Sequence, residues 1–207
     1  ASPSLRLTVA NLVIVSVGTL MLAVAMQRET ATSAALYYML HTTVISGALF
    51  LLADMISKQR GKAEDRYVNS RKMTHGKFLS AAFFIAALAV IGMPPLSGFI
   101  GKVLILQATE GLIETAWVWA VVLLAGLASL IAISRAGTTV FWRTSGESNL
   151  DEPIHALKKI AVVLLLSVSP LLVMFGGPVT EYTQQAAAQL HDTTQSVDAL
   201  LQPAEDK

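Results

Sequence analysis

Two side chains in this sequence could take part in proton transfer, although both lie within long apolar stretches. Lys102 directly follows an uncharged run of residues 78–101, and His41 lies inside another, residues 30–53. An ammonium group is costly to bury at membrane depth, and one that is surrounded by protein can exchange its proton as neighbouring charge comes and goes. Imidazole gains and loses a proton near neutral pH. The two residues therefore predict a proton relay.

Each of these residues also has a structural interpretation. Lys102 could extend its stem toward the membrane surface, but the next charged residue, Glu110, lies about 12 Å further along a helix. His41 could be a lone histidine that hydrogen-bonds to a neighbouring helix, with Tyr37 one turn before it as a supporting residue. Titratable groups on two separate spans favour the relay over two unrelated structural roles.

The stretch that carries Lys102 must tilt strongly or be interrupted within the membrane. A straight helix over residues 78–109 would measure about 48 Å, whereas the hydrocarbon core is about 30 Å thick. Pro94 and Pro95 lack the N–H groups that the carbonyls four residues earlier need. We therefore expect a discontinuous helix, with Ser97 and Gly98 beside the break, as is found at ion sites. The alternative is a turn in an ordinary helical hairpin.

The elements that must position these residues are membrane helices. Five runs without a charged residue each reach the length of about 20 residues that a membrane span needs. They cover residues 7–27, 30–53, 78–101, 115–134 and 160–180. Hydrophobic residues make up 54% of the chain and charged residues 14%, with a mean hydropathy of +0.59, which argues against a soluble domain. The sequence predicts an all-α polytopic membrane protein with about five transmembrane helices.

The basic residues predict the orientation of these spans. The net charge is only +1, but alternating spans place twelve of the fifteen Lys and Arg residues on one side of the membrane. The connection 55–77 holds most of them and is therefore expected in the cytoplasm. Arg135 is expected to anchor its span at that interface, with a part in ion movement as the alternative. Because acidic residues interrupt the basic loop and it joins two spans, nucleic acid is not an expected partner.

The chain divides into a predicted membrane domain, residues 1–177, and a tail, residues 178–207. The tail predicts an amphipathic helix on the non-cytoplasmic surface or against a partner subunit, with a frayed terminus as the alternative. Its apolar residues at helical spacing are Val179, Tyr182, Ala186, Leu190, Val197 and Leu200. The chain contains no cysteine, and we expect no metal site, no cofactor and no enzymatic activity. Because the sequence begins without methionine, a fragment is expected whose first span follows others; a signal peptide is the alternative.

Two segments resemble the proton-antiporter membrane family, which includes antiporter-like subunits of respiratory complex I. They are Tyr37–Asp54 and the Gly-Met-Pro-Pro stretch Gly92–Lys102. Further segments resemble the D subunit of its Mrp/Pha-type branch, namely Ser16–Leu20, Ala132–Gly137 and Phe141–Trp142. The resemblance covers the chain except its tail. It implies a fold of fourteen helices with two inverted five-helix repeats and discontinuous helices, of which this chain is similar to the last five.

Carried to individual positions, the resemblance implies that Lys102 is the terminal lysine of a proton channel and that His41 belongs to its central hydrophilic axis. Ser16 stands about where relatives from complex I commonly have a histidine, which implies a sparser or water-filled relay. The implied function is Na⁺ or K⁺ exchange for protons across a bacterial inner membrane, together with other antiporter subunits. A proton-pumping subunit of a redox complex, such as a hydrogenase-linked one, and a non-transporting membrane scaffold remain the alternatives.

Overall fold

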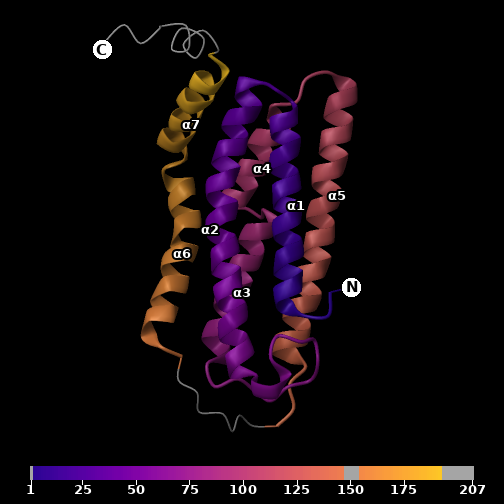
Figure 1. Ribbon diagram of the computed structural model, residues 1–207, viewed down its shortest axis with the longest axis vertical. Coiled ribbons are helices and arrows are strands. Elements are labelled where there is room, and N and C mark those ends of the chain that lie inside the picture. Colours follow the sequence, from indigo (N-terminus) through magenta and orange to yellow (C-terminus); the bar gives the residue numbers. More distant parts are fainter. Residues whose placement is uncertain (1, 147–153, 193–207) are drawn as a thin grey trace, which may run out of the picture.

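In the computed structural model, residues 2–146 and 154–192 are described, and most of them belong to helices that run along one long axis (Figure 1). The α-helices are α1 (Leu5–Ala25), α2 (Glu29–Gln59), α3 (Gly76–Ile91), α4 (Ser97–Gln107), α5 (Leu112–Gly137), α6 (Ala156–Met174) and α7 (Gly176–His191). A short 3₁₀ turn, η1 (Gly61–Ala63), follows α2, and a π-helical segment, η2 (Thr138–Trp142), extends α5. The predicted all-α class is confirmed.

Within residues 2–146 and 154–192, four helical segments are long and apolar enough to cross a membrane. They are α1, α2, α5 with its extension η2, and α6. The shorter apolar helices α3 and α4 follow one another along the same axis and are separated at Pro94 and Pro95 (Figure 1). This arrangement confirms the prediction of about five crossings, one of them discontinuous.

Helix α2 is the central element, because it packs against α1, α3, α4, α6 and α7. Small side chains on its surface let neighbouring backbones approach closely, as is usual between membrane helices. Its fully buried alanines are Ala31, Ala48 and Ala53. His41 lies near the middle of α2 and therefore faces several helices at once.

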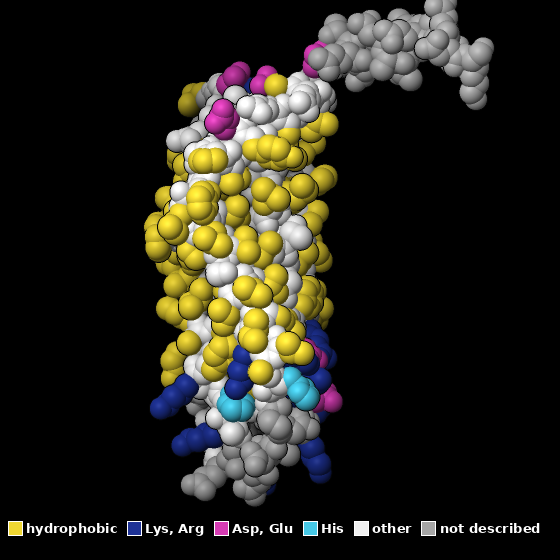
Figure 2. Space-filling view, turned by 90° about the vertical axis from the view of Figure 1, so that its left-hand side faces the viewer, with side chains coloured by type: hydrophobic (Ala, Val, Ile, Leu, Met, Phe, Trp, Pro, Cys, Tyr) yellow, Lys and Arg dark blue, Asp and Glu magenta, His cyan; other side chains and the backbone are white. Residues whose placement is uncertain are grey.

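The two ends of the bundle carry opposite charge. Figure 2 shows an apolar belt between Asp and Glu side chains at one end and mostly Lys and Arg side chains at the other. We call these the acidic end and the basic end. Trp117 and Trp142 lie near opposite ends of the segment formed by α5 and η2, and Trp142 is 79% exposed. They are separated by about 38 Å of helix, which suits tryptophans at the two membrane interfaces.

The loop at the basic end is folded around one arginine. The guanidinium of Arg60 is buried and donates hydrogen bonds to the hydroxyl of Ser70 and to the carbonyls of Glu64, Arg66 and Val68. Burial lowers the pKa of Arg60 from its ordinary value. These bonds give the loop a defined path between α2 and α3.

Helix α7 continues beyond α6 along the side of α2 (Figure 1). The hydroxyl of Ser33 lies 3.1 Å from that of Thr183, and Thr32 Oγ1 lies 2.9 Å from His191 Nε2. The helix predicted within the tail therefore begins at Gly176 and packs lengthwise on α2. Of the apolar tail residues, Val197 and Leu200 lie outside the described part of the chain.

Candidate functional site

The interruption between α3 and α4 leaves two carbonyl groups without their helical donors. In an uninterrupted helix the carbonyls of Val90 and Ile91 would accept from residues 94 and 95, which are prolines and have no N–H. Helix α3 instead ends at Gly92, whose φ of 86° is a left-handed conformation that glycine adopts readily. The chain resumes a helix at Ser97.

Lys102 supplies donors to both of these carbonyls. Its Nζ lies 2.5 Å from the Ile91 oxygen and 3.4 Å from the Val90 oxygen. A side chain on a helix leans toward that helix's N-terminus, so Lys102 on α4 reaches back over the break. Its ammonium therefore lies at the C-terminal end of α3, where the helix dipole favours a cation. The group points to the break and away from the acidic end.

No carboxylate neutralises this ammonium in the described part of the chain. The ion pairs found there lie at the two ends of the bundle, and none of them includes Lys102. Asp54 pairs with Lys158 at the basic end, and Arg28 pairs with Glu114 at the acidic end. The hydrogen bond from Arg28 to Glu114 raises the pKa of the arginine. Lys102 is thus a half-buried charge held by backbone carbonyls.

His41 reaches the other side of the same break. Its Nδ1 lies 2.7 Å from Ser97 Oγ, which in turn lies 2.8 Å from Ser169 Oγ on α6. His41 is 2% exposed, Ser97 is 0% and Ser169 is 1%. On its other edge, the imidazole ring approaches the backbone of Ala89 in the last turn of α3. Side chains from α2, α4 and α6 therefore form one buried series of hydrogen bonds, and α3 adds a backbone contact.

Gly98 permits the close approach of His41 to the break. A Cβ placed on Gly98 would lie 2.7 Å from His41 Nε2 and would overlap the carbonyl oxygen of Ala89. Both atoms therefore border the space next to Gly98, and any larger residue would displace the imidazole or the end of α3. The sequence placed Ser97 and Gly98 beside the break, and the structure shows that they also contact His41.

The two neighbouring tyrosines of α2 face different helices. The Tyr38 ring lies against His41, with ring centroids 5.9 Å apart, and its hydroxyl donates to Ser16 Oγ on α1 at 3.4 Å. Tyr37 turns to α6, where its hydroxyl donates to the carbonyl of Leu172 at 3.1 Å. Tyr38 is therefore the tyrosine in contact with the imidazole, whereas Tyr37 joins α2 to the last turn of α6.

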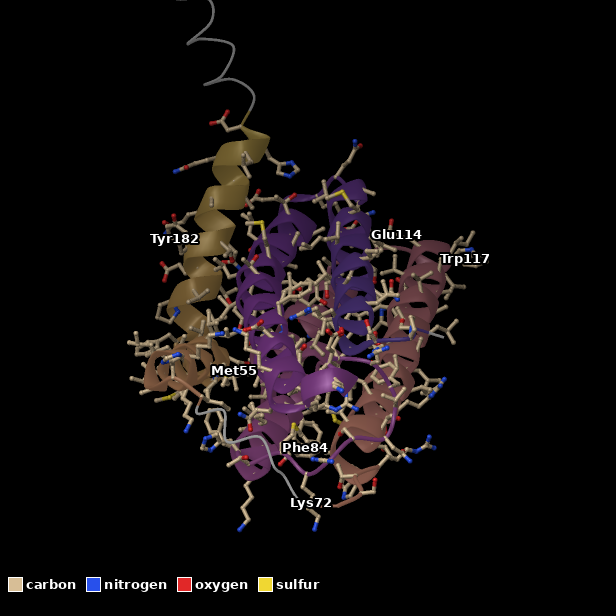
Figure 3. All side chains as sticks on the ribbon, turned by 60° about the horizontal axis from the view of Figure 1, so that its bottom comes forward. Met55, Lys72, Phe84, Glu114, Trp117 and Tyr182 are labelled. Carbon is tan, nitrogen blue, oxygen red and sulfur yellow. The ribbon has the colours of Figure 1, made fainter. Side chains whose placement is uncertain are left out.

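The other residues and surfaces of interest lie away from His41. Arg135 is exposed near the end of α5. A groove of about 560 Å³ opens between α3 and α5 and is lined by Phe84, Leu88 and Trp142, with Lys72 at the basic end. Figure 3 shows Lys72 at the near end of the bundle and Glu114 toward the other end of α5. The structure thus separates Arg135 from the chain around the break.

Ser169 is the member of this arrangement that sequence reasoning missed. It is a serine directly before Pro170 within the apolar run 160–180, and such a residue stands out only once its partners are known. In the described residues, no group of three or more His, Asp or Glu residues could hold a metal ion. The chemistry available at the break is therefore that of an ammonium, an imidazole and two hydroxyls, all of which can take part in proton transfer.

The amino-acid sequence around this site matches known proteins. Residues 7–132, which include both His41 and Lys102, match the family described as NADH:quinone oxidoreductase/Mrp antiporter, transmembrane. The chain is 32% identical over 196 residues to the D subunit of the Na(+)/H(+) antiporter of Bacillus subtilis and 28% identical over 193 residues to that of Alkalihalophilus pseudofirmus. It is 28% identical over 207 residues to the D subunit of the probable K(+)/H(+) antiporter of Rhizobium meliloti. These matches cover 91%, 91% and 86% of this chain but only 38% of each relative.

Proposed function

The chain belongs to the NADH:quinone oxidoreductase/Mrp antiporter transmembrane family, and on this basis we propose that it is the C-terminal part of the proton-translocating D subunit in a multisubunit Na⁺(K⁺)/H⁺ antiporter. The family resemblance inferred from Tyr37–Asp54 and Gly92–Lys102 is thereby confirmed. The chain spans 38% of the length of the relatives, so the complete transport path includes other parts of the protein.

The observation that carries this proposal is the position of two titratable side chains on opposite sides of one helix break. Lys102 is held by the carbonyls that the prolines leave without donors, and His41 is hydrogen-bonded to Ser97, the first residue of α4. Lys102 bonds to the end of α3 and His41 bonds to the start of α4, so a change of charge on either group acts on the same break. We assign Lys102 and His41 to proton translocation, with the break itself as the element that responds.

The partners follow from the same proposal. The membrane is the bacterial inner membrane, with the basic end and loop 55–77 in the cytoplasm. Other antiporter subunits complete the complex, protons enter the cell, and Na⁺ or K⁺ leaves it. The second candidate, a proton-pumping subunit of a redox complex, is favoured by the family description, which also names NADH:quinone oxidoreductase. Reading frames for small antiporter subunits beside this one would favour the first function, and redox subunits would favour the second.

The test is transport by the complete complex in everted membrane vesicles. Collapse of the proton gradient on addition of Na⁺ or K⁺ should be at least about 10-fold slower in His41→Ala, because the substitution removes a titrating group. The matched control is His155→Ala, an exposed histidine before α6, which should transport normally. Equal rates for His41→Ala and the wild type, with equal amounts of complex, would contradict the assignment of His41.

A further inference from the structure

Ser169 lies directly before Pro170 on α6 and bonds to the first residue of α4. In the structure, its Oγ accepts a hydrogen bond of 3.2 Å from the backbone N–H of Ser97 and lies 2.8 Å from the Ser97 hydroxyl. On its own helix, the carbonyl of Leu166 has lost its i+4 donor because residue 170 is a proline. A serine hydroxyl can bond to the carbonyl three or four residues earlier in its helix. The Leu166 carbonyl is therefore a second acceptor for Ser169.

The hydrogen bonds around His41 have one consistent direction when the imidazole is neutral. The backbone carbonyl of Ala89 can only accept, so the ring nitrogen that faces it, Nε2, carries the hydrogen. Nδ1 then has a free lone pair, and Ser97 must donate to it. The Ser97 oxygen in turn accepts from the Ser169 hydroxyl. All hydroxyl hydrogens in this state point toward His41.

A charged His41 requires the opposite direction. Both ring nitrogens of an imidazolium are donors, so Ser97 must accept from Nδ1 and turn its own hydrogen toward Ser169. Ser169 already accepts from the Ser97 backbone N–H and would now accept from the Ser97 hydroxyl as well. Its own O–H must therefore turn away from Ser97 to another acceptor. The Leu166 carbonyl is positioned on the same helix to take it.

We propose that Ser169 is a positioning residue for His41 and that the Ser169 hydroxyl is a switch that reverses with the protonation of the imidazole. In one state Ser169 donates toward Ser97, and in the other it donates to the Leu166 carbonyl that Pro170 leaves free. No proton is exchanged between helices by this reversal, since each serine keeps one hydrogen. The switch lets a buried histidine accept a proton at Nδ1 without leaving a hydroxyl that lacks an acceptor or faces another donor. The inference rests on the proposed role of His41 in proton translocation.

The charged and titratable groups near the imidazole are few. Lys102 on α4 interacts with it electrostatically, and the Tyr38 ring on α2 lies against it. The hydroxyl of Ser97 on α4 bonds to the imidazole and is itself bonded to Ser169 on α6, and from α3 the contact is the backbone of Ala89. A change at Ser169 therefore alters the hydrogen-bond direction and leaves these charges in place.

The decisive variant is Ser169→Ala in the complete complex. It removes the hydroxyl that reverses and leaves the charges around His41 in place, so cation-driven collapse of the proton gradient should be about 10-fold slower with an unchanged amount of complex. Ser169→Thr, which keeps a hydroxyl, should retain most of the rate. Ser167→Ala is the matched control, since Ser167 bonds only within α6 to the carbonyl of Leu164.

Histidine ¹⁵N NMR of the labelled complex supplies a readout that a merely structural role would not change. The His41 signal, assigned by its loss in His41→Ala, should show the Nε2–H tautomer in both the wild type and Ser169→Ala, but in Ser169→Ala the Nδ1 resonance should move toward that of a nitrogen without a hydrogen bond, because Ser97 is no longer held as a donor. A wild-type rate for Ser169→Ala, or an unchanged Nδ1 resonance in that variant, would overturn the switch. If His41→Ala transports normally, the proposed function of His41 fails as well; if His41→Ala is slow and Ser169→Ala is fast, only the switch fails.

Discussion

Replacing Lys102 by arginine separates a titrating lysine from one that only fills a structural role. The structure gives Lys102 a clear structural task, because its ammonium satisfies the carbonyls of Val90 and Ile91. A guanidinium keeps the positive charge and has several N–H donors, so it can perform this task. Loss of transport in an assembled arginine variant would therefore come from the missing deprotonation and not from the missing hydrogen bonds.

The size of the expected effect follows from the ordinary pKa values of the two groups. Lysine has a pKa of about 10.4 and the pKa of arginine is at least about two units higher, so at any working pH the neutral fraction of arginine is at least about 100-fold smaller. If Lys102 must release its proton in each cycle, Lys102→Arg should transport at least about 100-fold more slowly. Lys102→Ala is the weaker test: it leaves two carbonyls without donors, at about 1–3 kcal/mol each, which endangers the fold itself.

The assay is collapse of the proton gradient in everted vesicles on addition of Na⁺ or K⁺, with the amount of complex measured in parallel. Lys158→Arg serves as the matched control, because Lys158 pairs with Asp54 at the basic end and arginine can replace it there. That variant should transport at nearly the wild-type rate. A rate for Lys102→Arg above about one tenth of the wild-type rate would refute the requirement for deprotonation.

Two further predictions concern packing at the break and orientation in the membrane. Gly98→Ala should slow transport and destabilise the protein by about 1–3 kcal/mol, since its Cβ would overlap His41 and the Ala89 carbonyl. Gly47→Ala, on open space in α2, should be tolerated; equal thermal stability and equal transport of both variants would contradict the packing. A cysteine at exposed Asn69 should be shielded from an impermeant thiol reagent in intact cells, whereas one at exposed Gln189 on α7 should react. The reverse labelling pattern would invert the orientation.

Local chemistry explains what could be predicted from the amino-acid sequence. Uncharged runs of about 20 residues predict membrane helices because the bilayer excludes charge, and Pro94 with Pro95 predicts a break because neither can donate to the preceding turn. The orientation likewise could be predicted from the positions of Lys and Arg and the order of the spans alone. For these reasons the helical class, the number of crossings and the place of the break could be predicted, and Lys102 and His41 could be singled out as candidates.

The partners of these residues required the tertiary structure, because they depend on how each helix is rotated and on which helix lies beside it. Adjacent residues of a helix point in directions about 100° apart, so whether Tyr37 or Tyr38 meets the imidazole is set by packing. Ser169 lies 72 positions from Ser97 along the chain, and no local pattern joins them. Prolines in the sequence indicate which carbonyls lose their donors, but only the three-dimensional arrangement shows that Lys102 satisfies those of α3.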